Sequence, residues 1–263
     1  MKLLRARDNP RVRRWRRLMD DARERRRERR AILEGPHLLA AYLDSGGVPE
    51  ALLVSETGAQ RAEIAALAKR AGVAPTALAD GVFRSIADTE TPAGIAAEIA
   101  LPDAKPALAD APSCVFLERI QDAGNVGAIL RSAAALGLRD VVLGAGCADP
   151  WSQKVLRAAA GAHFSLRISA AADLVAALAR FGGKAVCTVP RGGTPLAEAD
   201  LSGRVGWIFG AEGQGVSGRL AARAALKVTI PMPGGAESLN VAVAAAICFY
   251  EMLRQLNIRG ARS

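Results

Sequence analysis

The residues most able to do chemistry gather in the last long stretch of the sequence, residues 230–251. Pro231 and the glycines after it end a short apolar strand, because these residue types interrupt regular structure. Three polar residues then precede a helix rich in Ala, Val and Ile: Glu237, Ser238 and Asn240. Free N–H groups at the start of a helix suit a polar or anionic ligand. The alternative is an ordinary cap, in which Ser238 or Asn240 accepts hydrogen bonds from the first-turn amides.

A second polar loop, residues 210–218, carries Glu212 and follows an apolar strand. Its segment Gly213–Gly218 matches the G-x-G-x-x-G pattern of dinucleotide sites, which would indicate a nicotinamide-dependent oxidoreductase. Only about ten residues separate this motif from the next strand, which is short for a crossover helix. The motif also does not follow the first strand of a nucleotide-binding half, so this interpretation is disfavoured. A third polar loop, residues 118–125, follows another strand.

Motifs and residue counts exclude several catalytic classes. The sequence has no G-K-[ST] phosphate cradle and no G-x-S-x-G nucleophile elbow. His37 and His163 are the only histidines, too few for a multi-histidine metal or catalytic centre. The cysteines lack metal-ligand spacing, and Cys114, Cys187 and Cys248 lie in apolar segments, which predicts buried thiols. We therefore expect no metal site.

Positive charge is concentrated at the N-terminus. Residues 1–30 hold fourteen Lys and Arg and five Asp and Glu, a net charge of +9 that equals the charge of the whole chain. Trp15, Leu18 and Ala22 lie at helical spacing among the arginines. A basic helix with a thin apolar seam is typical of contact with a phosphate backbone, so these residues are predicted to form a basic nucleic-acid-binding arm. A solvated helix and an anionic-membrane binder are the alternatives, and the thin seam disfavours the membrane.

The elements that must position the polar loops fall into two regions. Residues 31–100 predict a small α/β domain with a first strand over 31–34 and a closing strand over 94–99. Residues 101–112 contain three prolines and predict a linker. In residues 113–263 apolar strands alternate with helices, which predicts a parallel sheet covered on both faces. Ligands of such sheets bind at the carboxyl ends of strands, where all three polar loops lie.

Three segments together resemble the motifs of the SpoU (TrmH-like) RNA ribose 2′-O-methyltransferases of the SPOUT superfamily. The segment that resembles motif 1 is LERIQDAGNVGAILRSAAALG (117–137). Motif 2 corresponds to WIFGAEGQGVS (207–217), and motif 3 to IPMPGGAESLNVAVAAAICFYE (230–251). They occur in the family's order and spacing. EGPHLL and TPAGIAAEI, in residues 31–100, resemble the small substrate-binding domain that many members carry first.

This resemblance implies a fold, a cofactor and a partner. The fold is α/β, with a C-terminal parallel-sheet domain that contains a trefoil knot and a small α/β substrate-binding domain ahead of it. The cofactor is S-adenosyl-L-methionine, bound in the knot, and the partner is a second copy in a homodimer. The implied cofactor-binding residues are Gly210, Gly213, Gly215, Ile230, Met232 and Leu239. The implied catalytic residues are Asn125, Arg131, Glu212, Ser238 and Asn240.

Methylating a ribose 2′-hydroxyl requires that a poor acid lose its proton and align with the sulfonium methyl group. Arg131 resembles the family's catalytic arginine and projects beside Asn125 if the helix between them begins late. Because guanidinium stays protonated in proteins, we expect Arg131 to clamp an RNA phosphate and the nascent alkoxide, while that phosphate or solvent accepts the proton. Glu212 is expected to position Arg131 or the ribose, while Ser238 and Asn240 hold substrate or backbone.

The RNA is expected to be recognised by phosphate contacts and shape, because only 4% of the residues are aromatic. An additional N-terminal domain favours ribosomal RNA over transfer RNA. The alternative function is a non-catalytic RNA-binding protein of the same fold, which the five implied catalytic residues disfavour. No apolar run has the length of a membrane span and no secretory segment is present, so a soluble cytoplasmic protein is expected.

Overall fold

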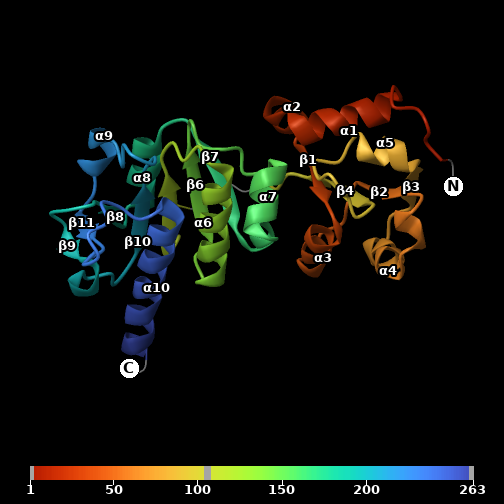
Figure 1. The fold of residues 1–263 in the computed structure, drawn as a ribbon. Helices are drawn as coiled ribbons and strands as arrows, with labels where there is room; N and C mark the ends of the chain where they lie inside the picture. Colours follow the sequence, from red (N-terminus) through yellow and green to blue (C-terminus); the bar gives the residue numbers. More distant parts are fainter. Residues whose placement is uncertain (1–2, 104–107, 261–263) are drawn as a thin grey trace. The chain divides into compact units, whose positions relative to one another are not determined.

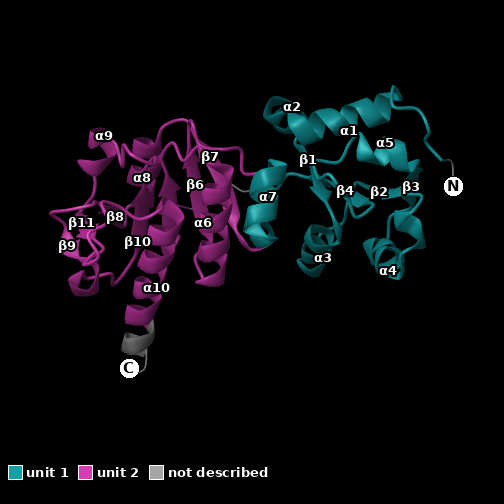
Figure 2. Ribbon diagram, in the orientation of Figure 1, with its two compact units in different colours: residues 1–103, 151–164 teal, residues 104–150, 165–263 magenta. Residues whose placement is uncertain are grey.

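The computed structural model describes residues 3–103 and 108–260, with side chains described as far as residue 256. The chain forms two compact units (Figures 1 and 2). Unit 1 contains residues 1–103 and 151–164, and unit 2 contains residues 104–150 and 165–263. Each unit combines one β-sheet with helices, so the predicted α/β class is confirmed.

Unit 1 is built on a four-stranded mixed sheet with the strand order β1-β4-β2-β3. The central strand β4 is antiparallel to both β1 and β2, and Ala97 pairs with Leu33 on one side and Leu52 on the other. Helices α3 and α4 cover one face of this sheet, and Ile64 and Leu67 of α4 lie in its apolar core. The bounds are β1 (Arg30–Glu34), α3 (Pro36–Asp44), β2 (Ala51–Ser55), α4 (Ala62–Ala71), β3 (Pro75–Leu78), α5 (Asp80–Arg84) and β4 (Ile95–Ala100).

The N-terminal helices are part of unit 1, which corrects the prediction that residues 1–30 form a separate arm. The apolar seam does not face outward: Val12, Trp15 and Leu18 are at most 1% exposed and pack in a second core with the sheet. The carboxylate of Glu98 on β4 accepts a hydrogen bond from the indole of Trp15 at 2.8 Å. The thin seam therefore fastens the basic helix to its own domain. The bounds are α1 (Pro10–Asp20) and α2 (Ala22–Glu28).

Residues 151–164 also belong to unit 1, although the sequence placed them in the C-terminal domain. Their helix, α7 (Gln153–Ala159), packs on β1, where the amide of Gln153 donates to the carbonyl oxygen of Ile32 at 2.8 Å. This contact joins residues far apart in the sequence, so local patterns do not reveal it. Within the predicted linker, residues 104–107 lie outside the described part of the chain, and the division between units falls beside them.

Unit 2 contains a seven-stranded sheet in the order β7-β6-β5-β10-β8-β11-β9, and every recorded pairing is parallel. The predicted parallel sheet is therefore confirmed, with the two-residue strand β9 added at one edge. The trefoil knot stays a prediction of the resemblance. The bounds are β5 (Ser113–Leu117), α6 (Ala123–Ala135), β6 (Asp140–Gly144), β7 (Arg167–Ala171), α8 (Leu174–Phe181), β8 (Lys184–Thr188), β9 (Thr194–Pro195), β10 (Val205–Phe209), α9 (Gly218–Ala221), β11 (Leu226–Thr229) and α10 (Val241–Gly260).

Helices cover both faces of this sheet, as its continuous apolar strands require. Ile208 of β10 packs in a cluster with Phe181 of α8. Its neighbour Phe209 points to the opposite face, where its ring meets Phe249 of α10 at a centroid distance of 5.7 Å. Helices α10 and α6 lie side by side on this second face (Figure 1). The alternation of side chains along β10 therefore fixes the last helix beside the helix that starts in motif 1.

Candidate active site

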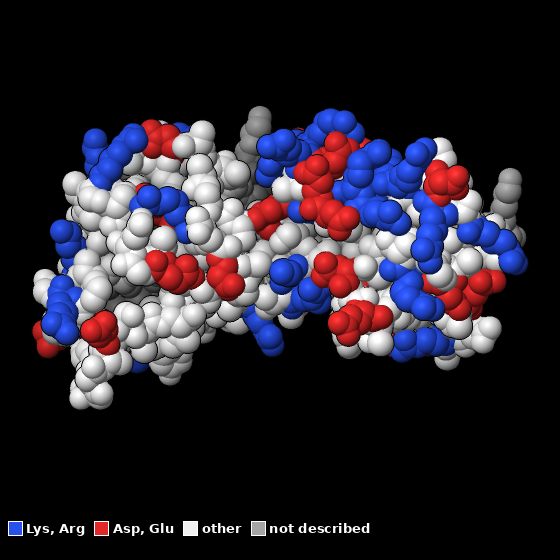
Figure 3. All heavy atoms as spheres, turned by 45° about the horizontal axis from the view of Figure 1, so that its top comes forward, with Lys and Arg blue, Asp and Glu red and all other residues white. Residues whose placement is uncertain are grey.

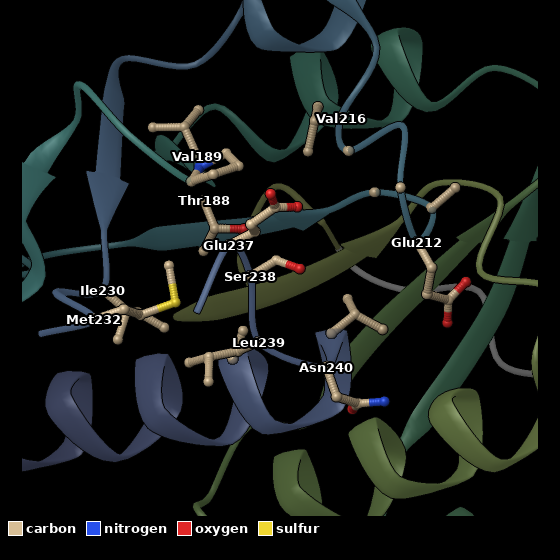
Figure 4. Close-up of a pocket in the computed structure, with 17 residues that line it drawn as sticks. Thr188, Val189, Glu212, Val216, Ile230, Met232, Glu237, Ser238, Leu239 and Asn240 are labelled. Carbon is tan, nitrogen blue, oxygen red and sulfur yellow. The ribbon is translucent and has the colours of Figure 1, made fainter. Parts of the chain in front are cut away.

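A cavity of about 520 Å³ lies at the carboxyl ends of three adjacent strands, β8, β10 and β11 (Figure 4). This volume lies within the range of roughly 300–1,000 Å³ that is common for small-molecule sites. The lining comes from the segments that follow those strands, residues 188–190, 210–216 and 230–241, together with Ala244 on α10. The position matches the rule for open parallel sheets, because loops from neighbouring strands converge there.

A chain of side-chain hydrogen bonds links the three polar loops next to this cavity. The amide nitrogen Nδ2 of Asn125 donates to the carboxylate of Glu212. The amide Nδ2 of Asn240 donates to Oδ1 of Asn125 at 2.9 Å. Glu212 and Asn240 both line the cavity. Asn125 thus joins Glu212, 87 positions away in the sequence, to Asn240, 115 positions away.

Helix starts hold two members of this chain in place. Asp122 precedes α6 and its Oδ1 accepts from the backbone N–H of Asn125 at 2.7 Å. Asn240 precedes α10, and its Oδ1 accepts from the backbone N–H of Ala242 at 2.9 Å. The amide group of Asn240 therefore caps a helix with its oxygen and holds Asn125 with its nitrogen. The predicted cap is therefore present, and the role of Asn240 as a site residue stays a prediction.

The loop after β10 folds back on itself around glycine. The N–H of Gly215 donates to the carbonyl oxygen of Ala211 at 2.8 Å. A Cβ atom at Gly210 would lie 2.1 Å from the backbone of Gly215, so only glycine fits there. The same loop is held from outside, because the carboxylate of Glu118 accepts from the N–H of Ser217 at 2.7 Å. These contacts hold the backbone of the loop in place along one side of the cavity.

The remaining predicted cofactor residues also line the cavity. Ile230, Met232 and Leu239 form an apolar side of it, and Ser238 lies between them and the loop after β10 (Figure 4). Gly213 and Gly215 have φ angles of 81° and 67°, which favour glycine. All six residues that the sequence assigned to the cofactor are therefore among the lining residues: Gly210, Gly213, Gly215, Ile230, Met232 and Leu239.

The comparisons with known proteins agree with this geometry. The SpoU rRNA Methylase family matches residues 112–250, and the MRM3-like substrate binding domain matches residues 9–97. The chain belongs to the SpoU rRNA methylase family. The second match includes α1 and α2, so it too places the basic helices inside the small domain.

Relatives of this SpoU chain include proteins described as ribosomal RNA methyltransferases. The 23S rRNA (guanosine(2553)-2′-O)-methyltransferase RlmP of Bacillus subtilis is 35% identical over 254 residues, covering 96% of this chain and 99% of the relative. The mitochondrial rRNA methyltransferase 3 of Mus musculus is 34% identical over 151 residues, covering 55% of this chain and 36% of the relative.

Solved structures of the family include two with the methyl donor bound. One is an AdoMet-bound rRNA methyltransferase from Sinorhizobium meliloti, with a TM-score of 0.83, 27% identity and coverage of 97% of this chain and 98% of that chain. The other is the SpoU methyltransferase AviRb from Streptomyces viridochromogenes with AdoMet, with a TM-score of 0.83, 25% identity and coverage of 94% and 98%. The predicted family, enzyme class and S-adenosylmethionine cofactor are confirmed.

Asn125 and Arg131 are predicted catalytic residues that do not line the cavity, and Arg131 is the one that also lies outside the hydrogen-bond chain. It is exposed on α6, and within the described residues it has no assigned contact with Glu212 or Asn240. The expectation that it projects beside Asn125 required a late helix start. Helix α6 instead begins at Ala123, before Asn125, so six residues turn Arg131 about 240° around the helix. Glu212 binds Asn125 in its place.

The sequence missed one whole side of the cavity. Thr188 ends β8, which lies between β10 and β11 in the sheet, and Val189 and Pro190 follow it. The apolar run over residues 185–189, one of the strands expected in the C-terminal domain, was the available signal, because its carboxyl end joins the others once the strand order is known. Glu237 also lines the cavity and was named only as part of the polar trio before the last helix.

The cysteines lie outside the cavity lining. Burial raises the pKa of the Cys248 thiol to about 12, and burial also raises the pKa values of Cys114 and Cys187. These three thiols are buried, as the apolar segments around them predicted. Among the described residues, no group of three or more His, Cys, Asp or Glu is placed to hold a metal ion, and no helix has the length and apolarity to cross a membrane.

Proposed function

We propose that this chain transfers the methyl group of S-adenosylmethionine to a ribose 2′-hydroxyl of ribosomal RNA at the cavity beside Asn125, Glu212 and Asn240. The observation that carries the proposal is the hydrogen-bond chain through these three side chains, which joins all three SpoU motifs at one edge of a cofactor-sized cavity. When bound there, the cofactor supplies an electrophilic methyl group on a sulfonium.

The lining suits this cofactor. Glycine backbone on one side and Ile230, Met232 and Leu239 on the other form a narrow slot with an apolar wall, suited to adenine. Glu212 and Ser238 add polar side chains to the lining. The chemistry of the lining therefore separates a flat apolar part from a polar part, as a nucleoside joined to an amino acid requires.

The polar side chains are proposed to hold the sugar hydroxyl in line with the methyl group. The network leaves unused hydrogen-bonding capacity on Glu212 and on the amide groups of Asn125 and Asn240, so they have groups to offer a ribose. Ser238 is exposed and lines the cavity, which makes it a further candidate contact. The hydroxyl oxygen forms the new bond to carbon as the carbon–sulfur bond breaks, and its proton passes to an RNA phosphate or to solvent.

Arg131 is proposed to act on the RNA from outside the cavity. It is an exposed cation on the helix that carries Asn125, and no hydrogen bond or ion pair is assigned to it within the described residues. A guanidinium matches the geometry of a phosphate with two hydrogen bonds. Arg131 is therefore proposed to clamp an RNA phosphate without being positioned by Glu212.

Unit 1 is proposed to bind the RNA through outward arginines of α1 and α2. Lys and Arg side chains gather over these helices, with acidic side chains between them (Figure 3). Arg13, Arg23 and Arg26 are exposed, and within the described part of the chain none of their guanidinium groups has an assigned hydrogen bond or ion pair. Charge of this kind binds phosphates without reading sequence. The match of this unit to a substrate-binding domain supports the same proposal.

Ribosomal RNA is the proposed substrate class because the two relatives named above carry ribosomal RNA in their descriptions. The cytoplasm is the proposed location of this protein.

A homodimer is proposed through α10. Val243, Ile247 and Tyr250 are 48%, 37% and 61% exposed, and their spacing places them in one apolar stripe. A second copy is the proposed occupant because the family resemblance implies a homodimer. Replacing Tyr250 with Asp is expected to lower the mass measured by sedimentation to that of a monomer. Leu256→Asp, at an exposed position off the stripe, is the control, and an unchanged mass for Tyr250→Asp would contradict the proposal.

Transfer of labelled methyl groups from S-adenosylmethionine to purified RNA tests the proposed function. After digestion to nucleosides, the label is expected in a 2′-O-methylnucleoside of ribosomal RNA. RNA binding without any transfer would instead support the non-catalytic alternative. Label on a base would show that the chemistry is assigned to the wrong atom.

A further inference from the structure

The cavity differs in charge from the rest of the molecule. Its lining contains two carboxylates, Glu212 and Glu237, and no Lys, Arg or His. The whole chain has a net charge of +9. The cavity lining is therefore acidic although the protein as a whole is basic. Such a lining favours a cationic ligand over a neutral one of the same shape.

The two carboxylates differ in their partners. Glu212 accepts a hydrogen bond from the amide of Asn125 and belongs to the side of the cavity that meets the sugar. Glu237 has no assigned hydrogen bond or ion pair within the described residues. Glu212 and Glu237 are both among the lining residues drawn in Figure 4. Glu237 is therefore the carboxylate whose charge stays available to a ligand.

The donor and the product of the reaction differ in charge more than in shape. S-adenosylmethionine carries a sulfonium, an ammonium and a carboxylate, so it has one net positive charge. S-adenosylhomocysteine has lost the sulfonium charge and is neutral overall. An apolar slot for adenine holds both equally well, because the nucleoside is the same. Discrimination between them needs a group that responds to the charge at sulfur.

We propose that Glu237 is a specificity-determining residue that selects the cationic methyl donor over the neutral product. The proposal rests on the assignment of this cavity to S-adenosylmethionine. The negative charge of Glu237 stabilises the sulfonium form of the ligand, and this stabilisation disappears when the methyl group leaves. Product then dissociates more readily than donor, which limits inhibition by the product.

Calorimetric titration of Glu237→Gln with each ligand tests this selection. The variant keeps nearly the same shape and loses the charge. Affinity for S-adenosylmethionine is expected to fall about tenfold, equal to ~1.4 kcal/mol, while affinity for S-adenosylhomocysteine changes less than about twofold. Retained product binding shows that the cavity is still folded. Equal losses for both ligands, or no loss for the donor, would overturn the proposal.

Two further variants sharpen this test. Glu237→Asp keeps the charge and is expected to keep most of the preference for the donor. Glu198→Gln removes an exposed carboxylate of unit 2 that does not line the cavity, and both affinities are expected to stay unchanged. Raising the salt concentration from about 50 mM to about 500 mM should weaken donor binding in the natural chain and less so in Glu237→Gln.

The same titrations separate this inference from the proposed function. A natural chain that binds neither ligand would remove the assignment of the cavity to the cofactor. A natural chain that binds both ligands, with Glu237→Gln unchanged in its preference, would remove only the role of Glu237.

Discussion

Glu98 of unit 1 and Glu212 of unit 2 are both glutamates that join distant segments, and they do so in opposite ways. Glu98 is 5% exposed, and both of its oxygens accept hydrogen bonds from Arg14, at 2.7 and 2.9 Å. The indole of Trp15 adds another hydrogen bond. Glu212 is exposed at a cavity and is engaged by the neutral amide of Asn125. A carboxylate that accepts three hydrogen bonds from its own domain stabilises the fold, whereas one with open capacity is available to a substrate.

The electrostatics of Glu98 fit its structural role. Burial alone would raise the pKa of its carboxyl group, but the hydrogen bonds from Arg14 and Trp15 and the charges of Arg14 and Arg30 outweigh burial and lower it. A lowered pKa means that the folded state favours the ionised form. Its contribution to stability is therefore present above the pKa of the unfolded chain and is lost as the pH falls through the folded value.

The largest expected effect comes from breaking the hydrogen-bond chain that holds Glu212. Replacing Asn125 with Ala removes the side chain that joins Glu212 to Asn240. Turnover in methyl transfer is expected to fall about 100-fold or more, because oriented polar groups at a reacting oxygen have effects of this size. Affinity for S-adenosylmethionine, measured by calorimetry, is expected to stay within about threefold, since Asn125 is not part of the cavity lining. Full turnover in this variant would show that the network is only structural.

Replacing Glu98 is expected to lower the stability of the fold and to leave the rate of methyl transfer unchanged. Glu98→Gln leaves Arg14 and Arg30 without their buried partner, which is expected to lower the free energy of unfolding by about 3 kcal/mol. Chemical denaturation measures this change, and below a pH of about 4.3 the difference from the natural chain should shrink. Glu50→Gln is the matched control, because Glu50 pairs with Arg30 at an exposed position and should cost less than about 0.5 kcal/mol. Equal losses in the two variants would contradict the buried role.

The same comparison applies to two arginines. Arg14 forms ion pairs with Glu28 and Glu98, whereas no ion pair is assigned to Arg131 within the described residues. Arg131→Lys keeps the charge but loses the two-pronged geometry, so turnover is expected to fall about tenfold, the effect of one hydrogen bond between charged groups. Arg139→Lys, at another exposed position of unit 2, is the control. Near-normal turnover of Arg131→Lys in steady-state assays would remove the phosphate clamp.

The smallest expected effect concerns RNA affinity. Joint replacement of Arg13, Arg23 and Arg26 by Ala is expected to weaken RNA binding several-fold and to reduce the slope of log affinity against log salt by about 2. Cofactor affinity should not change. Filter binding at several salt concentrations measures the slope. Arg61→Ala with Arg70→Ala is the control, because those arginines pair with Glu63 and Asp44. An unchanged slope in the triple variant would exclude this face as the RNA contact.

Point replacements are the appropriate test of the basic helices, since deleting residues 1–30 would remove part of a core. Trp15 and Leu18 are buried against the sheet of unit 1. Such a deletion would therefore destabilise unit 1 as well as remove its basic side chains. The sequence showed the seam of α1 but not its destination, because helical spacing identifies an apolar face without identifying what covers it.

The sequence predicted unit 2 better than it predicted contacts across the chain. Apolar strands and polar loops are local patterns, so the parallel sheet and the positions of Glu212 and Asn240 at strand ends could be read directly. The pairing of Asn125 with both could be expected only from the family resemblance. The contact of Gln153 with β1 and the place of Thr188 in the cavity depend on strand order and on long-range packing. Arg131 was expected beside Asn125 only if the helix began late, and the helix begins at Ala123, before Asn125.

Mapping of 2′-O-methyl marks in RNA from cells that lack this protein tests the central claim most directly. Loss of a mark in ribosomal RNA, restored by the natural chain and not by Asn125→Ala, is the predicted result. Ribosomal RNA with every mark intact, or a mark lost from transfer RNA instead, would contradict it.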